Sequence, residues 1–372
     1  MYRGFLRRIE IYPSLYVSSN KLPIAVTKNS LPILNDLPQD PQVVRSLSEL
    51  PDKPVAYPHD RSQFDWVGHG LHYFSYSYYL RQVFGYRVQR VSVDAGFTCP
   101  NVDGTVAVGG CTFCDNRSFS PSRRLPRQDI LAQIDEGIFR IKRRYKCKHF
   151  MAYFQPATNT YAPVETLKPL YEKAISHPEV MSLAIGTRQD CVPDDVLDLL
   201  EVFAAKIPLT VEYGLQTIHN KSLDWMNRGH YHDSFIDAME RSVDRGFELC
   251  AHIMLGLPGE THEDMMATAQ AVAESDLDAV KIHNLYAVDN TPLADQVRSG
   301  EVKLMERDEY INTLVDFLER LPPTMVVERI SGEAPGDWFV GPEWCTDKPA
   351  VLRAVNEEFV RRGTKQGSSF KA

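Results

Sequence analysis

Three cysteines gather just after an apolar run that predicts a buried strand. The run at 91–98 leads to Cys99, and a Gly-Gly pair leads to Cys111, with Cys114 three positions further on. Four cysteines fill the coordination of a four-iron cluster, which then mainly moves electrons, whereas three leave one iron open to bind and activate another molecule. The alternatives are a structural zinc site, which needs four Cys or His ligands, and buried free thiols. The next cysteine, Cys147, lies too far along the chain for zinc spacing, so the triplet favours an iron–sulfur cluster.

Length, charge and cysteine count restrict the class of protein. The 372 residues suffice for one large α/β domain with extensions. A net charge of −8 argues against a surface that binds polyanions throughout, although it allows a local basic patch. The seven cysteines are an odd number, and three of them bunch between Cys99 and Cys114, which indicates a metal site in a reducing compartment. No apolar run has membrane-spanning length, and charge interrupts the first ten residues too early for a signal peptide, so we expect a cytoplasmic protein without membrane contact.

Strands and helices are expected to alternate over most of the chain. Strands are predicted at 88–94, 149–155, 181–186, 209–214, 248–255 and 278–284, with helices between them. Six such units imply a parallel sheet with right-handed crossovers. We therefore predict an α/β fold, a partial (β/α)6 TIM-type barrel, whose site lies at the C-terminal ends of the strands.

The two ends of the chain differ from this core. Residues 1–70 are rich in proline and keep no helical or alternating period, which predicts a loosely ordered extension. The barrel is expected to span 71–290, and a C-terminal α/β extension, 291–372, is expected to pack on it and cover one side of the site.

Polar residues and glycines cluster after the predicted strands. Because the C-terminal ends of parallel strands meet at one rim of a barrel, these residues are expected to surround a single site with the cysteine loop. The candidates are Gln155, Thr158, Arg188, Glu212, Gln216, Gly256, Gly259 and His283.

Several of these residues belong to recognisable motifs. The chain contains Asp94-Ala-Gly-Phe-Thr-Cys99-Pro-Asn, Gly109-Gly-Cys111-Thr-Phe-Cys114, Gly186-Thr-Arg188, Glu212-Tyr-Gly-Leu-Gln216, Gly256-Leu-Pro-Gly-Glu260-Thr, Lys281-Ile-His283 and Arg362-Gly-Thr-Lys-Gln-Gly367. With them, roughly Tyr73 to Gly367 resembles the radical S-adenosylmethionine (SAM) superfamily, and within it the YhcC-like group, related to the catalytic subunit of elongator. The superfamily has three residues between its first two cysteines, whereas this chain has eleven, a gap that the YhcC-like group shares. The Gly-Gly-Glu that usually follows the second strand is absent, and residues 155–160 stand in its place, which leaves open the group that binds the methionine amine.

The resemblance implies a reaction. Cys99, Cys111 and Cys114 would ligate a [4Fe–4S] cluster whose fourth iron chelates the amino and carboxylate groups of SAM. Electron transfer would cleave SAM, and the resulting 5′-deoxyadenosyl radical would abstract hydrogen from a substrate. The hard chemistry would belong to the cofactors, and the protein would orient them and exclude water. An electron donor such as flavodoxin or ferredoxin is implied as a partner.

The resemblance also carries residues over to the SAM site. Phe113 would shield the cluster and lie near the adenine, or it is a plain core aromatic. Gln155 and Thr158 would contact the methionine moiety, or they cap a strand end. Arg188 suits the SAM carboxylate because a guanidinium fork fits a carboxylate, although a structural salt bridge is the competing interpretation. Gln216 is carried over by its motif as a cofactor contact.

The remaining candidates keep two interpretations each. Glu212 would accept from ribose hydroxyls or pair with Arg188. Gly256 and Gly259 would let the backbone approach the adenosyl group, or they form a turn before Thr261 as a helix N-cap. His283 would face the substrate, or it is a packed structural residue.

The substrate is not readable from the sequence. An RNA base, in tRNA or another RNA, is the leading suggestion because the elongator relatives act on tRNA. A basic run at 140–148 could contact a phosphate backbone, or it could complement the dipole at a helix end. Arg117, Arg123, Arg124 and Arg127 could extend that patch. Two other functions stay open: a zinc- or cluster-binding structural or regulatory protein without radical chemistry, and a degenerate SAM-binding module.

Overall fold

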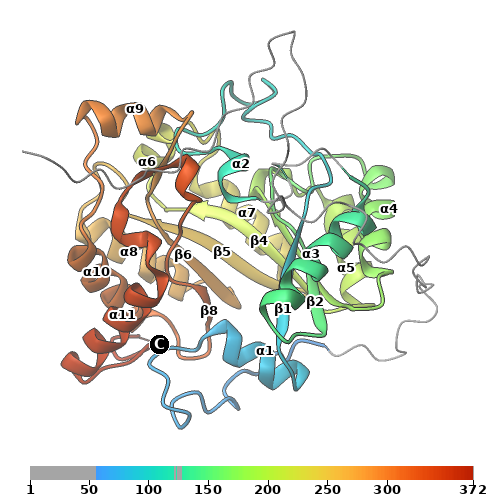
Figure 1. The fold of residues 1–372 in the computed structure, drawn as a ribbon, viewed down its shortest axis with the longest axis horizontal. Coiled ribbons are helices and arrows are strands. Elements are labelled where there is room, and N and C mark those ends of the chain that lie inside the picture. Colours follow the sequence, from blue (N-terminus) through green and yellow to red (C-terminus); the bar gives the residue numbers. More distant parts are fainter. Residues whose placement is uncertain (1–55, 121–122, 124–127, 372) are drawn as a thin grey trace, which may run out of the picture. The chain divides into compact units, whose positions relative to one another are not determined.

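A seven-stranded parallel sheet forms the centre of the fold (Figure 1). The computed structural model describes residues 56–120, 123 and 128–371, which belong to one compact unit, Pro41–Ala372, and a second unit, Met1–Asp40, lies outside the described residues. The strands, in spatial order, are β1 (Val88–Val93), β2 (His149–Phe154), β3 (Val180–Thr187), β4 (Leu209–Gln216), β5 (Glu248–Leu255), β6 (Ala279–Asn284) and β8 (Val326–Arg329).

The predicted α/β partial barrel is confirmed. Each of the first six strands begins and ends within two residues of its predicted range, and all neighbouring strands pair in parallel. Strand β8, from the C-terminal region, pairs with β6 and adds a seventh strand. The described sheet order begins at β1 and ends at β8, so the barrel is open between these two strands.

Helices cover the sheet. Figure 1 shows α3, α4 and α5 on one side of the strands and α8, α10 and α11 on the other. In α3 the isoleucines at 130, 134 and 138 are buried, and Asp129 caps the first turn by accepting from the Leu131 backbone N–H. The helices around the barrel are α3 (Ile130–Arg144), α4 (Val164–Ile175), α5 (Asp194–Ala204), α6 (Asn220–Trp225), α7 (His232–Ser242), α8 (His262–Ala273), α10 (Arg307–Arg320) and α11 (Lys348–Arg362). None of the helices in the described ranges is long and apolar enough to cross a membrane.

Residues 56–70 differ from the predicted loose extension, most of which, 1–55, lies outside the described residues. Tyr57 is buried in an aromatic cluster, and Arg61 forms ion pairs of 2.7 Å with Glu248 and with Asp278. Aromatic anchors and buried ion pairs hold this segment although it has no regular period. The aromatic stretch that follows forms the short helix α1 (Tyr76–Phe84).

The C-terminal region adds elements that lie beside the cysteine loop. Helix α9 (Pro292–Ser299) follows strand β7 (Ala287–Val288), which pairs antiparallel with β9 (Phe339–Gly341). The Leu293 backbone N–H donates to the Thr112 carbonyl at 3.0 Å, which ties α9 to the loop that carries the cysteines. A four-residue helix, α2 (Asn116–Phe119), follows that loop.

Candidate active site

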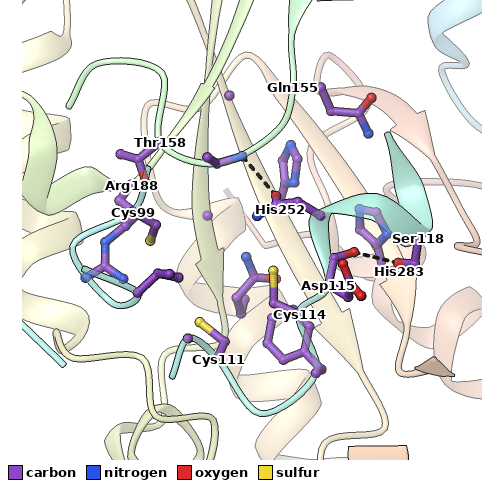
Figure 2. A pocket seen from close by; sticks show the side chains of 18 of the residues that line it. Cys99, Cys111, Cys114, Asp115, Ser118, Gln155, Thr158, Arg188, His252 and His283 are labelled. Carbon is purple, nitrogen blue, oxygen red and sulfur yellow. Dashed lines mark hydrogen bonds between the residues drawn. The ribbon is translucent and has the colours of Figure 1, made fainter. Parts of the chain in front are cut away.

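A cavity of about 510 Å³ opens at the C-terminal ends of the strands. Cys99, Cys111 and Cys114 all line it, and Figure 2 shows their sulfur atoms around a common space. Cys111 is buried, and the other two cysteines are half-buried. The geometry therefore brings the cysteine triplet to the rim that the parallel topology predicts.

The eleven-residue gap in the cysteine motif forms an anchored loop. The Val102 and Asp103 backbone N–H groups donate to the Cys99 carbonyl at 2.8 and 3.1 Å, which turns the chain after the first cysteine. The Asn227 side-chain amide donates to the Val108 carbonyl at 3.1 Å and to the Gly110 carbonyl at 2.8 Å. A residue far along the sequence thus fixes the approach to the second cysteine.

Two side chains donate hydrogen bonds to the Cys111 sulfur. Asn101 Nδ2 and Arg228 Nη1 each lie 3.4 Å from Cys111 Sγ. Arg228 Nη2 also donates to the Gly214 carbonyl at 2.8 Å, and a Cβ at Gly214 would lie 2.4 Å from that nitrogen. Glycine at 214 therefore leaves room for a guanidinium against the cysteine loop.

The donor set fits a [4Fe–4S] cluster. Three thiols face one cavity, and thiolates are the ligands that select iron–sulfur clusters. Burial and the neighbouring Cys111 and Cys99 raise the pKa of the Cys114 thiol, so a cationic partner is needed to hold all three as thiolates. In the part of the chain that the structure describes, no group of three or more His, Cys, Asp or Glu side chains is placed to hold a single metal ion.

Arg188 forms a bidentate ion pair instead of projecting as a free cation. Its Nε and Nη2 donate to the two carboxylate oxygens of Asp190 at 2.9 and 2.6 Å, and its Nη1 donates to the Arg228 carbonyl at 2.9 Å. Burial raises the pKa of the Asp190 carboxyl, but the Arg188 guanidinium lowers it more, so the pKa lies below its ordinary value. The contacts match the structural salt bridge that the sequence left open as one of two interpretations.

Glu212 lies at the centre of a buried charge network on the inner face of the barrel. Its carboxylate accepts from Tyr153 Oη at 2.6 Å, from His252 Nε2 at 2.7 Å and from Lys281 Nζ, and Arg90 Nη2 lies 3.0 Å away. Although burial alone would raise it, Lys281 and Arg90 hold the pKa of Glu212 well below its usual range. Glu212 therefore does not pair with Arg188, one of the two roles considered for it.

Two histidines line the same cavity. The rings of His252 and His283 lie 5.6 Å apart, and both side chains appear in Figure 2 on a wall away from Cys99. Burial lowers the pKa of both imidazoles. The positive charge of Arg329 lowers that of His283 further, and the positive charge of Lys281 lowers that of His252 further. Both rings are consequently held neutral.

Comparison with known proteins gives the family. The patterns described as "Radical SAM superfamily" and "Radical_SAM C-terminal domain" match residues 105–272 and 277–361. The chain is 39% identical to protein YtqA of Bacillus subtilis over 80% of its own length and 93% of that protein. It is 35% identical to protein YhcC of Escherichia coli over 78% of its length and 93% of YhcC. The chain belongs to the radical SAM superfamily.

More distant similarities cover less of the chain. A tRNA uridine(34) acetyltransferase of Methanocaldococcus jannaschii is 29% identical over 43% of this chain and 30% of that protein. The solved structure of Elp3 from Methanocaldococcus infernus superposes with a TM-score of 0.58 at 18% identity, over 75% of this chain and 64% of that one. The similarity to the Elp3 structure concerns the fold alone. In sequence, the chain is similar to the YhcC-like group, as its motifs predicted. The family implies a [4Fe–4S] cluster and SAM.

Most of the predicted site residues of this radical SAM enzyme come together. Besides the cysteines, the cavity is lined by Phe113, Gln155, Thr158, Arg188, Glu212, Gln216 and His283. Phe113 also packs against a cluster of buried apolar residues, which matches its interpretation as a core aromatic, and its role beside the adenine stays a prediction. The backbone N–H of Thr158 donates to the Thr98 carbonyl at 3.2 Å, which ties the second predicted loop to the cysteine loop.

The two candidate glycines are not brought to the cavity. Gly256 has a φ of +86°, and a Cβ there would meet Met305 at 3.3 Å, so packing and backbone conformation account for this glycine. Gly259 has a φ of +79° and precedes a capping box formed by Thr261 and Asp264 at the start of α8. These contacts match the turn interpretation of the motif.

Other cavity residues were missed by sequence reasoning. Arg228 follows the six-residue helix α6 in a segment without a motif, and Tyr153 and His252 each stand inside an otherwise apolar part of a strand. Arg329 ends strand β8, outside the predicted barrel. A tyrosine or histidine inside an otherwise apolar strand was the available signal for two of them.

Proposed function

We propose that this enzyme cleaves SAM reductively at a [4Fe–4S] cluster held by Cys99, Cys111 and Cys114, and that its substrate is a base in RNA. When bound, the cluster would supply the electron that converts SAM into methionine and a 5′-deoxyadenosyl radical, which then abstracts hydrogen from the substrate. The observation that carries the proposal is the lining of one cavity by three thiols together with the polar rim of the barrel.

The chain's own residues would hold and tune the cluster. Asn101 and Arg228 donate to the Cys111 sulfur, and such hydrogen bonds stabilise negative charge on a cluster ligand. The anchored loop before Cys111 limits movement of the ligand. The half-buried Cys99 and Cys114 face the cavity, where SAM would reach the open iron.

The two histidines of the cavity are compatible with a cationic cofactor. His252 and His283 are held neutral, so they add no charge that would repel the sulfonium of SAM. Phe113, Thr158, Gln155 and Gln216 are the cavity residues that we assign to SAM. We assign Arg188 to the support of this site through Asp190, since its guanidinium is already occupied.

An RNA substrate is supported by the similarity to the tRNA uridine(34) acetyltransferase and by residues near the cysteine loop. Arg117 lines the cavity, and its guanidinium lies 5.1 Å from the ring centre of Trp338. Arginine planes and aromatic rings of this kind stack on splayed bases. Arg124 and Arg127 lie outside the described residues.

The basic run at 140–148 lies at the opposite end of the barrel. It begins in the last turns of α3 and ends just before β2, whereas the cavity lies at the C-terminal ends of the strands. Arg143 and Arg144 are exposed and lie over the rings of Phe139 and Tyr145. If RNA contacts this run, it does so away from the reacting base. We propose flavodoxin or ferredoxin as the electron donor, and it would dock beside the cysteine loop and not on this run, because the run lies at the end of the barrel away from the cysteines.

Anaerobic reconstitution with iron and sulfide tests the reaction. The protein should turn brown, its reduced-cluster EPR signal should change when SAM is added, and 5′-deoxyadenosine should form. Cys99→Ala, Cys111→Ala and Cys114→Ala should each lose the signal and the product. Cys345→Ala is the matched control, because Cys345 is buried and does not line the cavity.

Two outcomes would contradict the reaction. A colourless protein carrying one zinc per chain would identify a zinc protein. A brown protein that forms no 5′-deoxyadenosine would be a cluster-binding structural or regulatory protein. The RNA substrate is tested separately, by comparing modified nucleosides in RNA from cells with and without this gene, and identical nucleoside profiles would exclude it.

A further inference from the structure

A second cavity adjoins the first on the open side of the barrel. It has a volume of about 440 Å³ and is lined by residues of α3, β1, β6 and β8. The two cavities share three lining residues, Tyr153, Gln155 and Arg329. In Figure 2, Gln155 and His283 lie on the side of the first cavity away from Cys99 and Cys111. A molecule bound in the first cavity that extends from the cysteines toward the second cavity would therefore contact Arg329.

Nearly every other cation along the two cavities is paired with an acid. In the first cavity, Arg117 pairs with Asp115, Arg123 with Asp94, and Arg188 with Asp190. In the second cavity, Arg90 and Lys281 share Glu212 and Glu328, and Arg140 pairs with Glu136. Among the described residues Arg228 forms no ion pair with an acid, but it donates to the Cys111 sulfur, which would carry negative charge as a ligand of the proposed cluster.

Arg329 has no such compensation. Its Nε donates to the Ser331 carbonyl at 2.8 Å, and among the residues at 56–120, 123 and 128–371 its guanidinium forms no ion pair with a carboxylate. The side chain is half-buried at the end of β8, a strand that is paired to β6 in the sheet. A guanidinium partly withdrawn from water is stabilised by an anion, and the passage between the cavities holds this positive charge without one.

We propose that Arg329 binds the phosphate of a nucleotide substrate whose base occupies the first cavity. This inference rests on the proposed RNA function, and it names the contact that positions the substrate. The planar guanidinium presents two parallel N–H donors, which match two oxygens of a phosphate. With Nε fixed on Ser331, the terminal nitrogens are left for the ligand.

The surroundings of Arg329 fit this role. Its positive charge contributes to lowering the pKa of His283, after burial, so that ring stays neutral and does not compete for the phosphate. Tyr286 and His283 both line the first cavity beside Gly332, where a Cβ would come within 2.8 Å of Tyr286 and 2.9 Å of His283. These rings form an apolar and neutral wall against which a base can lie while its phosphate reaches Arg329.

Binding of uridine 5′-monophosphate and of uridine to the reconstituted full-length protein tests the proposal. The nucleotide should bind about tenfold or more tightly than the nucleoside, since a charge-assisted hydrogen bond contributes that much. Arg329→Gln should abolish this preference, and Arg329→Lys should restore part of it. Arg140→Gln is the matched control, because it removes the same charge from the second cavity at a residue paired with Glu136.

Formation of 5′-deoxyadenosine from SAM alone separates this proposal from the proposed function. The unmodified protein should form it whether or not the phosphate site exists, since Arg329 is assigned to the substrate and not to SAM. An unchanged preference for the nucleotide in Arg329→Gln would overturn the phosphate site even if SAM is cleaved. Displacement of bound nucleotide by inorganic phosphate supports the proposal, whereas displacement by succinate and not by phosphate would identify a carboxylate site and overturn the nucleotide assignment.

Discussion

Arg90 of β1 donates through Nη2 to both carboxylate oxygens of Glu328 of β8, each at 2.8 Å. These residues stand on the first and last strands of the sheet order, so the ion pair spans the open side of the partial barrel. The Glu328 side chain is fully buried, and Lys281 lies 3.4 Å from it. The two acids and two bases of the network balance, which explains how four charges are tolerated inside the barrel.

Glu328→Gln should destabilise the protein strongly. It leaves Arg90 and Lys281 to share Glu212 alone, and breaking a buried pair of this kind costs about 3–5 kcal/mol. Urea unfolding followed by circular dichroism would measure the free energy of unfolding. Glu136→Gln is the matched control, since it removes the exposed pair with Arg140 and should cost less than about 1 kcal/mol. Equal losses in the two variants would show that the network does not hold the barrel edges together.

Glu248 predicts a pH dependence of stability. Burial raises the pKa of this carboxyl to about 7 despite the opposing charge of Arg61, with Asp278 adding to the rise. The folded state therefore keeps a proton that the unfolded state releases above its ordinary pKa of 4.5. Stability from this group is full below that pKa and is lost as the pH rises to about 7, a change of about 3 kcal/mol.

Glu248→Gln isolates this contribution because glutamine resembles the protonated acid. Relative to the unmodified protein, the variant should gain about 3 kcal/mol between about pH 5 and about pH 8, measured by urea unfolding at each pH. Glu179→Gln, which removes a more exposed acid paired with Lys142, serves as the control. A relative stability of Glu248→Gln that is the same at both pH values would contradict the raised pKa.

Arg228 should set the reduction potential of the proposed cluster. Its hydrogen bond and charge stabilise the reduced state, so Arg228→Gln should shift the midpoint potential to more negative values by tens of millivolts. Gly214→Ala should shift it in the same direction, because the added Cβ would displace the guanidinium. A redox titration followed by EPR measures both variants. Arg117→Gln is the control and should leave the potential unchanged, because Arg117 lines the same cavity but is paired with Asp115. An unchanged potential in both Arg228→Gln and Gly214→Ala would contradict the role of Arg228.

The sequence predicted the barrel well because its signals are local. Runs of buried residues such as β4, which is buried along its whole length, alternate with amphipathic helices, and these patterns fix element type without knowledge of distant contacts. The cysteine loop and the polar residues after each strand were therefore placed on one rim. Strand β8 does not continue the regular strand–helix repeat of the first six strands. Its pairing with β6 was therefore harder to predict from the sequence than the pairing of those strands.

Distant contacts account for what the sequence left open. Arg188 was a candidate for the SAM carboxylate, but its partner Asp190 is decided by side-chain geometry and not by the motif. Glu212 of β4 pairs with Lys281 of β6 and with Arg90 of β1. These three strands are far apart in the sequence, so the pairing could not be read from it. Arg228 approaches the cysteine loop from a segment without a motif, so no local pattern could reveal it.

Gly137 lies inside α3 at a point where the helix meets β1. Alanine is normally favoured over glycine in a helix by about 1 kcal/mol. Here, however, a Cβ at 137 would lie 2.4 Å from Cγ1 of Val91, a buried and β-branched side chain that cannot move aside easily. Overpacking should outweigh the gain, so Gly137→Ala should lower the free energy of unfolding by about 1–2 kcal/mol.

In a Val91→Ala background the same substitution should instead stabilise the protein by up to about 1 kcal/mol, which a double-mutant cycle measures by urea unfolding. Stabilisation of the unmodified protein by Gly137→Ala would mean that α3 can shift away from β1, and the second cavity beside it would then be free to widen.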